Sequence, residues 1–217
     1  MLAKIGEKEK AEMVILSSDL SPREKVGLLL EVNPERAEEL GMKYREHRLL
    51  IEYLGKRKEY EKVIDIYRAS DGVGYLTSYV CEAIKATGRF EVFEEILNKE
   101  SPDVAFLCAV ELGLGERIIE LFPEAVERYM KGPLPRRTIL NAIMLIEDEL
   151  MLILPSIEKL VEFEVAKKNR AAYEFAAELL KLVKKADAEE YERLMEKLKK
   201  KHPRIKVLWE ILERTTT

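Results

Sequence analysis

Acid–base or metal chemistry has few candidates in this chain. The two histidines, His47 and His202, are far apart in the sequence, and neither belongs to a motif that activates a nucleophile or holds a metal ion. The glycine pairs in Asp71 to Gly74 and in Gly113 to Gly115 lack the third glycine and the preceding strand of a phosphate-binding loop. We therefore expect no catalytic residue, no cofactor and no bound metal, and we predict that the protein is not an enzyme.

One carboxylate departs from this pattern. If the apolar helix that begins at Ile139 is unbroken, Glu147 lies on its apolar face, where ionisation of a carboxyl group is costly without a partner. An enzyme or ligand site built on a buried acid with a raised pKa is one interpretation. The other is that the helix breaks at Glu147 to Glu149 and that Asp148 caps a short second helix.

Tyrosines offer a candidate surface for recognition. Six of the nine tyrosines lie before residue 80. Aromatic side chains with a polar tip are favoured at protein interfaces. Tyr53 and Tyr75 lie beside the main apolar stripes, so we predict that they are the exposed, protein-binding members of the group. The alternative is that the tyrosines belong to the core, with their hydroxyls at its edge.

A basic cluster lies near the C-terminus. Its members are Lys197, Lys199, Lys200, Lys201, Arg204 and Lys206. Such a cluster can neutralise nucleic-acid phosphates, and its binding then weakens steeply with salt. Positive charge also complements the end of a helix, and several glutamates just before the cluster dilute its field. A nucleic-acid-associated protein is therefore the second hypothesis, after a protein-binding one.

The two cysteines, Cys81 and Cys108, each lie in an apolar helical pattern and have no metal-binding spacing. Reduced cysteine behaves as a small hydrophobic residue, so we expect buried free thiols. A disulfide between adjacent helices is the alternative, because intracellular proteins of hyperthermophiles are an exception to the rule that cytosolic thiols stay reduced. The sequence does not decide between them.

The composition is that of a globular protein. Hydrophobic residues make up 47% and charged residues 36% of the 217 positions, and the net charge is −4. No apolar stretch has the length of a signal peptide or of a membrane-spanning helix, so we predict a cytoplasmic protein with no membrane partner. Glutamine is absent and asparagine occurs only four times, which indicates a thermophile, where heat selects against amides.

Helical periodicity positions all of these residues. Apolar residues recur at spacings of three and four, and Ser21 with Pro22 and Ser101 with Pro102 are typical helix starts. Two second helices of predicted hairpins begin at Tyr60 and Phe90, about 30 residues apart, a period that is typical of stacked hairpins. We predict an all-α fold, a right-handed stack of antiparallel hairpins with about 11–13 short helices.

A resemblance supports this organisation. Glu59 to Tyr67 and Gly88 to Leu97 resemble the start of the second helix in tetratricopeptide-type repeats, where a turn residue and an aromatic precede the helix. The likeness covers residues 43–130 and implies a tetratricopeptide-like α-solenoid. Val63 and Phe93 stand where that family places a small residue, so its peptide-binding groove is not transferred to particular residues of this chain.

The domain organisation follows from the same pattern. The helices that contain Phe106 and Ile143 are apolar almost all round, so we expect both to be central and covered on two sides. The stiff connector at residues 132–135 divides helical hairpin repeats at residues 1–131 from a helical bundle at residues 136–217. We predict a non-catalytic helical-repeat scaffold that binds a protein or peptide partner. A homo-oligomer is compatible with an exposed repeat edge.

Overall fold

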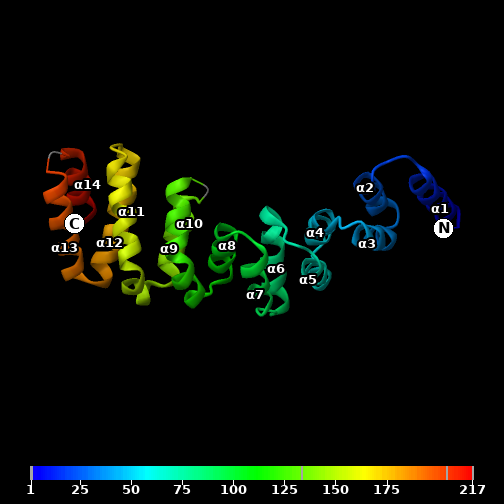
Figure 1. The fold of residues 1–217 in the computed structure, drawn as a ribbon, viewed down its shortest axis with the longest axis horizontal. Coiled ribbons are helices and arrows are strands. Elements are labelled where there is room, and N and C mark those ends of the chain that lie inside the picture. The colour runs from blue at the N-terminus through cyan, green and yellow to red at the C-terminus, as the bar shows by residue number, and fades with distance from the viewer. Residues whose placement is uncertain (1, 133, 204, 217) are drawn as a thin grey trace. The chain divides into compact units, whose positions relative to one another are not determined.

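The computed structural model describes residues 2–132, 134–203 and 205–216. It is helical throughout, with 14 α-helices, two 3-10 helices and no strand in the described ranges (Figure 1). The predicted all-α class is therefore confirmed, with slightly more helices than expected. The contacts divide the chain into two compact units, Met1–Val104 and Ala105–Thr217.

The first unit holds seven α-helices and one 3-10 helix. They are α1 (Leu2–Ser17), α2 (Pro22–Val32), α3 (Pro34–Lys43), α4 (His47–Lys56), α5 (Tyr60–Ala69), η1 (Gly74–Leu76), α6 (Thr77–Thr87) and α7 (Val92–Lys99). Their starts follow from local chemistry. Ser21 and Glu24 form a reciprocal capping box at the start of α2, and the Asn33 side chain accepts a hydrogen bond from the first turn of α3.

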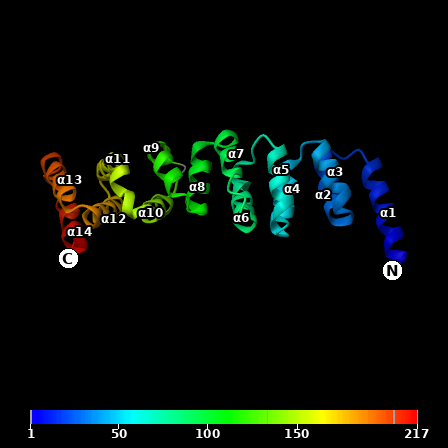
Figure 2. The ribbon, with the colours of Figure 1, turned by 90° about the horizontal axis from the view of Figure 1, so that it is seen from below.

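Neighbouring helices of the first unit pack in pairs. The closest partners are α2 with α3, α4 with α5, and α5 with α6, and α4 also contacts α2 and α6 (Figure 2). The interior between α4 and α5 is made of fully buried side chains such as Leu50, Leu54 and Ile64. Ion pairs connect α5 to two other helices. Lys62 on α5 pairs with Glu38 on α3, and Arg68 on α5 pairs with Glu95 on α7.

The second unit continues the helical order. Its elements are α8 (Pro102–Leu112), within which the division falls, α9 (Gly115–Lys131), α10 (Arg136–Leu145), η2 (Glu147–Ile153), α11 (Leu154–Ala166), α12 (Arg170–Ala186), α13 (Ala188–Lys201) and α14 (Lys206–Thr216). Helix α12 is its centre, because it contacts α11, α13, α14 and η2. Residues 132–135, where the sequence predicted a boundary, connect α9 to α10, and Gly132 closes α9 in the left-handed conformation.

The apolar patterns of α8 and α10 predicted that both helices are central and covered on two sides. Leu107 on α8 and Met144 and Leu145 on α10 are exposed. Their apolar patterns are broader than the faces that their neighbours cover. Cys81 and Cys108 are buried as predicted, but neither is a free thiol, since both are disulfide-bonded.

Within the described part of the chain, no helix combines the length and the apolar character needed to cross a bilayer.

Candidate functional site

The two tyrosines predicted to be exposed have different surroundings. Tyr75 lies in η1 and its residue surface is 77% exposed, the highest value among the large hydrophobic residues of the described chain. Tyr53 lies on α4 and is half-buried, with the guanidinium of Arg57 5.3 Å from the centre of its ring. Tyr75 is therefore the more accessible of the two.

A carboxylate accepts hydrogen bonds from the backbone of the turn that carries Tyr75. Glu100, the residue after α7, accepts hydrogen bonds from the backbone N–H groups of Val73 at 2.6 Å and Gly74 at 2.9 Å. Gly72 and Gly74 have φ values of 107° and 61°, a left-handed backbone that a residue with a side chain rarely adopts. The glycines let the turn bend, and Glu100 fixes the bend.

An arginine of α4 donates a hydrogen bond to the same turn. Arg48 Nη2 donates to the carbonyl of Val73 at 3.1 Å, and its guanidinium lies 5.4 Å from the centre of the Tyr75 ring. The Thr77 hydroxyl donates to the Gly74 carbonyl at 2.6 Å. The Tyr75 ring is thus exposed but supported on a fixed backbone, an arrangement that lowers the conformational entropy lost on binding.

Tyr53 and the Arg48 side chain that contacts Tyr75 leave α4 on different sides. Arg48, which contacts the Tyr75 ring, is five residues before Tyr53 on α4. Five residues rotate a side chain by roughly 140° around a helix axis, so Tyr53 points to a different side of α4.

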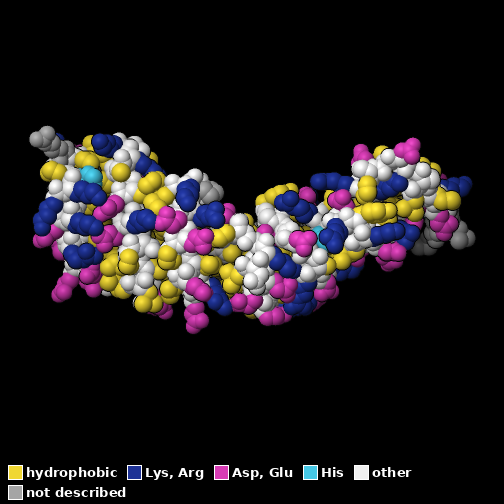
Figure 3. Space-filling model, in the orientation of Figure 1, with side chains coloured by type: hydrophobic (Ala, Val, Ile, Leu, Met, Phe, Trp, Pro, Cys, Tyr) yellow, Lys and Arg dark blue, Asp and Glu magenta, His cyan; other side chains and the backbone are white. Residues whose placement is uncertain are grey.

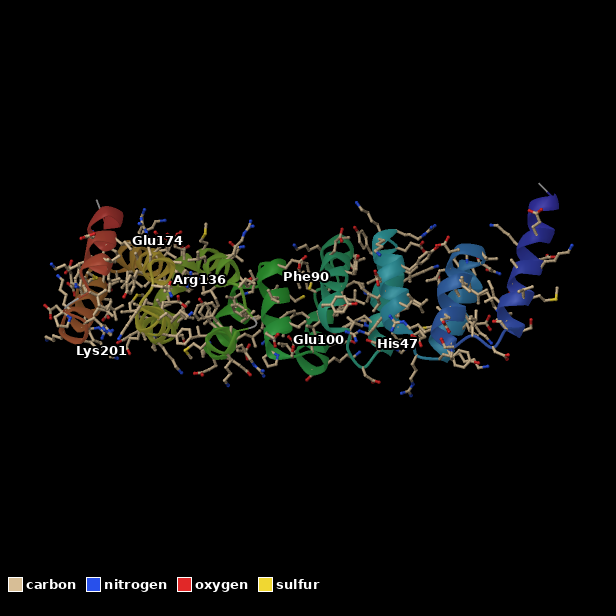
Figure 4. The ribbon with its side chains drawn as sticks, turned by 90° about the horizontal axis from the view of Figure 1, so that it is seen from above. His47, Phe90, Glu100, Arg136, Glu174 and Lys201 are labelled. Carbon is tan, nitrogen blue, oxygen red and sulfur yellow. The ribbon has the colours of Figure 1, made fainter. Side chains whose placement is uncertain are left out.

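A buried histidine lies near this turn. Figure 4 places His47 and Glu100 toward the same edge of the first unit. His47 begins α4 and is only 9% exposed. Burial lowers the pKa of His47 below its ordinary value, an effect that the Asp71 carboxylate opposes and the Arg45 guanidinium adds to.

The basic cluster is partly neutralised by its own unit. Lys197 pairs with Glu158 and Glu162 of α11, and Lys201 Nζ lies 2.8 Å from a carboxylate oxygen of Glu162. Hydrogen bonds from Lys201 and Lys197 hold the pKa of Glu162 below its ordinary value. All five described members of the cluster are exposed, including the paired Lys197 and Lys201, and Arg204 lies outside the described residues.

Glu147 is not buried in an apolar face. The helix ends at Leu145, as the second interpretation predicted, and η2 begins at Glu147. The Glu147 side chain is 37% exposed and forms an ion pair with Lys185 of α12. Asp148 does not cap η2, because Ile146 occupies the capping position without a side-chain hydrogen bond.

Among the described residues one carboxylate is fully buried, Glu164 on α11, and no pattern in the sequence indicates it. It accepts hydrogen bonds from the Tyr129 hydroxyl at 2.6 Å, from Arg136 Nη2 at 2.7 Å and from Lys167 Nζ. Burial, together with the hydrogen bond to Glu164, raises the pKa of Tyr129 to about 12. Figure 4 shows Arg136 among the side chains between α10 and α11.

The Glu164 cluster is self-contained. The ring of Tyr129 packs against those of Phe163 and Phe175, and Lys167 lies 4.3 Å from the centre of the Phe163 ring. Arg136 also donates to the carbonyl of Ala171 at 2.9 Å, which ties α10 to α12. These groups are hydrogen-bonded to one another, and the cluster joins the helices of the second unit.

Neither a metal-binding group nor a similar protein indicates a function for the described part of the chain. Among the residues that the structure describes, no three His, Cys, Asp or Glu side chains are grouped to hold a metal ion. Comparison with protein-family models, with curated proteins and with solved structures finds no match. The functional argument therefore rests on the geometry of the chain itself.

Proposed function

We propose that the protein is a non-catalytic helical-repeat scaffold that binds a protein or peptide partner, with Tyr75 as an anchor of the contact. The observation that carries this proposal is the highly exposed Tyr75 ring on a turn fixed by Glu100 and Arg48. Rigid aromatic anchors with a polar tip are enriched among the residues that contribute most to binding.

We also propose that the helices of the first unit form a right-handed, tetratricopeptide-like α-solenoid. The pairing of α2 with α3 and of α4 with α5 supports it, as do the contacts of α4 with both α2 and α6. In such a stack each hairpin covers the next, and a long surface remains available for a partner. Helix α5 begins at Tyr60 as predicted, whereas α7 begins at Val92 and not at Phe90, so the starts of these two helices are 32 residues apart.

The experiment is site-specific photo-crosslinking in the native host. A photoreactive phenylalanine analogue replaces Tyr75 in one variant and Tyr44, another exposed aromatic of the first unit, in a matched control. We expect one stoichiometric protein adduct from position 75 and none from position 44. Tyr75→Ala should then weaken binding of the identified partner by about tenfold or more, and Tyr44→Ala by less than about twofold. Equal labelling from both positions would refute the anchor.

The other two hypotheses have less support. Glu158 and Glu162 neutralise Lys197 and Lys201, so fewer charges of the basic cluster remain for phosphate groups. An enzyme built on Glu147 lacks its central feature, a carboxylate held in an apolar environment, because this side chain is partly exposed and paired.

A further inference from the structure

A group of exposed hydrophobic side chains lies on the second unit, where α10 is followed by η2. Met144, Leu145, Met151 and Leu152 are 64, 50, 38 and 67% exposed, and we call these four residues the α10–η2 patch. In Figure 3, hydrophobic side chains gather along the lower edge of this unit, where the segment between α10 and α11 lies. Single exposed hydrophobic residues are ordinary, but several together mark a contact surface.

The core of the unit does not account for the patch. A different set of residues on α10 and η2 is buried, namely Ile139, Ala142, Ile143, Leu150 and Ile153. Met144 follows one buried residue and Leu152 precedes another, so each points away from the buried side. This short segment therefore has buried apolar side chains that stabilise the fold and exposed apolar side chains that are not part of the core.

In the sequence, three carboxylates lie between the two apolar pairs of the patch. Glu147 pairs with Lys185 of α12, whereas Asp148 and Glu149 are exposed. Exposed apolar side chains that alternate along the chain with exposed carboxylates are complementary to a segment in which apolar side chains alternate with lysine or arginine. Methionine suits such a contact, because its flexible and polarisable side chain adapts to the shape of a peptide.

The same charges disfavour two other occupants. In a symmetric contact whose two-fold axis passes through the patch, Asp148 and Glu149 of one copy would approach the same residues of the other. An anionic lipid surface would meet the same repulsion. A basic protein segment is the occupant that gains from both the apolar and the charged groups.

We propose that the α10–η2 patch docks a basic amphipathic segment of another protein. Apolar side chains of that segment pack on Met144, Met151 and Leu152, and its lysines or arginines lie near Asp148 and Glu149. The inference rests on the proposed function, since it requires a protein partner. It uses a surface of the second unit, however, so Tyr75 takes no part in it.

The test is fluorescence anisotropy on the full chain. The probe is a short labelled helical peptide of leucine and lysine with all leucines on one face. We expect saturable binding that the double change Met144→Ser with Leu152→Ser weakens by about tenfold or more, and that Asp148→Lys with Glu149→Lys weakens as strongly. The matched control changes two other exposed apolar residues of the unit, Leu107→Ser with Val207→Ser, and should alter the affinity less than about twofold.

Several outcomes would overturn the proposal. They are equal binding of a peptide with glutamate in place of lysine, an equal loss in the control variant, and no loss in the patch variant. A dimer seen by sedimentation that Met144→Ser with Leu152→Ser dissociates would identify a second copy as the occupant. Phosphatidylserine vesicles that bind the wild type but not this variant would identify a membrane. Tyr75→Ala should leave the peptide affinity unchanged, so failure here and failure of the Tyr75 anchor are distinguishable.

Discussion

Among single residues, Glu164 combines complete burial with three charged or hydroxyl donors: Tyr129 on α9, Arg136 on α10 and Lys167, which follows α11. Glu164→Gln keeps the shape but removes the negative charge that compensates Arg136 and Lys167. Removing one partner of a buried ion pair typically costs about 3–5 kcal/mol. Because the two cations are about one-third exposed, water offsets part of this loss, and we expect a decrease at the lower end of that range in the free energy of unfolding.

Chemical denaturation of the wild type and of a matched variant measures this effect. Glu174 on α12 also pairs with an arginine, Arg170, but its side chain is 50% exposed. Glu174→Gln should therefore change the free energy of unfolding by less than about 0.5 kcal/mol. Similar values for the two variants would show that the Glu164 cluster does not stabilise the second unit.

His47 links the stability of the first unit to pH. Burial holds its folded-state pKa below the unfolded value, so the unfolded chain binds the proton more readily. This contribution to stability is fully present above the unfolded pKa of about 6.5 and is lost as the pH falls toward the folded pKa. Between these values the free energy of unfolding should fall with decreasing pH, by at most about 1.4 kcal/mol per pH unit.

Urea denaturation of wild type and His47→Gln across this pH range measures the slope. His47→Gln should remove the part of the pH dependence that lies just below the unfolded pKa. The His202→Gln variant serves as the control for loss of a histidine from another unit. An unchanged slope in His47→Gln would contradict the assignment.

The residues that hold the candidate site could not be found from the sequence. Tyr75 was predicted to be exposed because it falls beside the apolar stripe. Arg48 and Glu100, which fix its turn, are ordinary charged residues in the sequence and become significant only because the fold brings them to residues 72–74. Glu164 is hidden for the same reason, since nothing in its neighbours marks it as the one acid that three helices enclose.

At the level of helices, residue types predicted where several helices begin better than they predicted which helix faces are buried. Ser21, Asn33 and Asp187 cap helices as their residue types indicate, because a cap depends on only a few neighbouring residues. The helix α10 was expected to be central because it is apolar all round, yet Met144 is exposed. Periodicity shows which faces are apolar, but only tertiary packing determines which of them a neighbour covers.

Two glycines test the packing of neighbouring helices. Gly55 lies where α4 approaches Tyr79 of α6, and a Cβ atom at this position would lie 2.6 Å from Cγ of that ring. Gly55→Ala should therefore lower the free energy of unfolding by about 1–3 kcal/mol, because the contact is too tight for an added methyl group. Gly27, inside α2, has nothing within 4 Å of such an atom.

Gly27→Ala is the matched control. It should raise the free energy of unfolding by about 0.5–1 kcal/mol, because alanine restricts the unfolded chain and favours the helix. Denaturant titrations of both variants measure the difference. If both changes stabilise the protein, α4 and α6 do not approach as closely as the structure places them.

For the protein as a whole, composition and ion pairing suggest resistance to heat. Each unit carries ion pairs that share partners, such as Arg68 with Glu91 and Glu95, and Glu158 with Arg193 and Lys197. Isolated surface pairs contribute about 0–1 kcal/mol each at room temperature, but the desolvation penalty of networks falls on heating. Together with the missing glutamine, these networks lead us to expect thermal unfolding above the range of about 45–65 °C that is usual for mesophile domains.

Circular dichroism during heating measures the midpoint, and salt separates the contribution of the ion pairs from that of the core. Because sodium chloride at about 1 M shortens the screening length to about 3 Å, it should lower the midpoint by weakening the exposed pairs. The buried side chains between α4 and α5 and around α12 lose nothing to screening, so cooperative unfolding should persist at high salt. A midpoint within the mesophile range would refute the thermophile interpretation. A high midpoint that salt leaves unchanged would assign the heat resistance to the core.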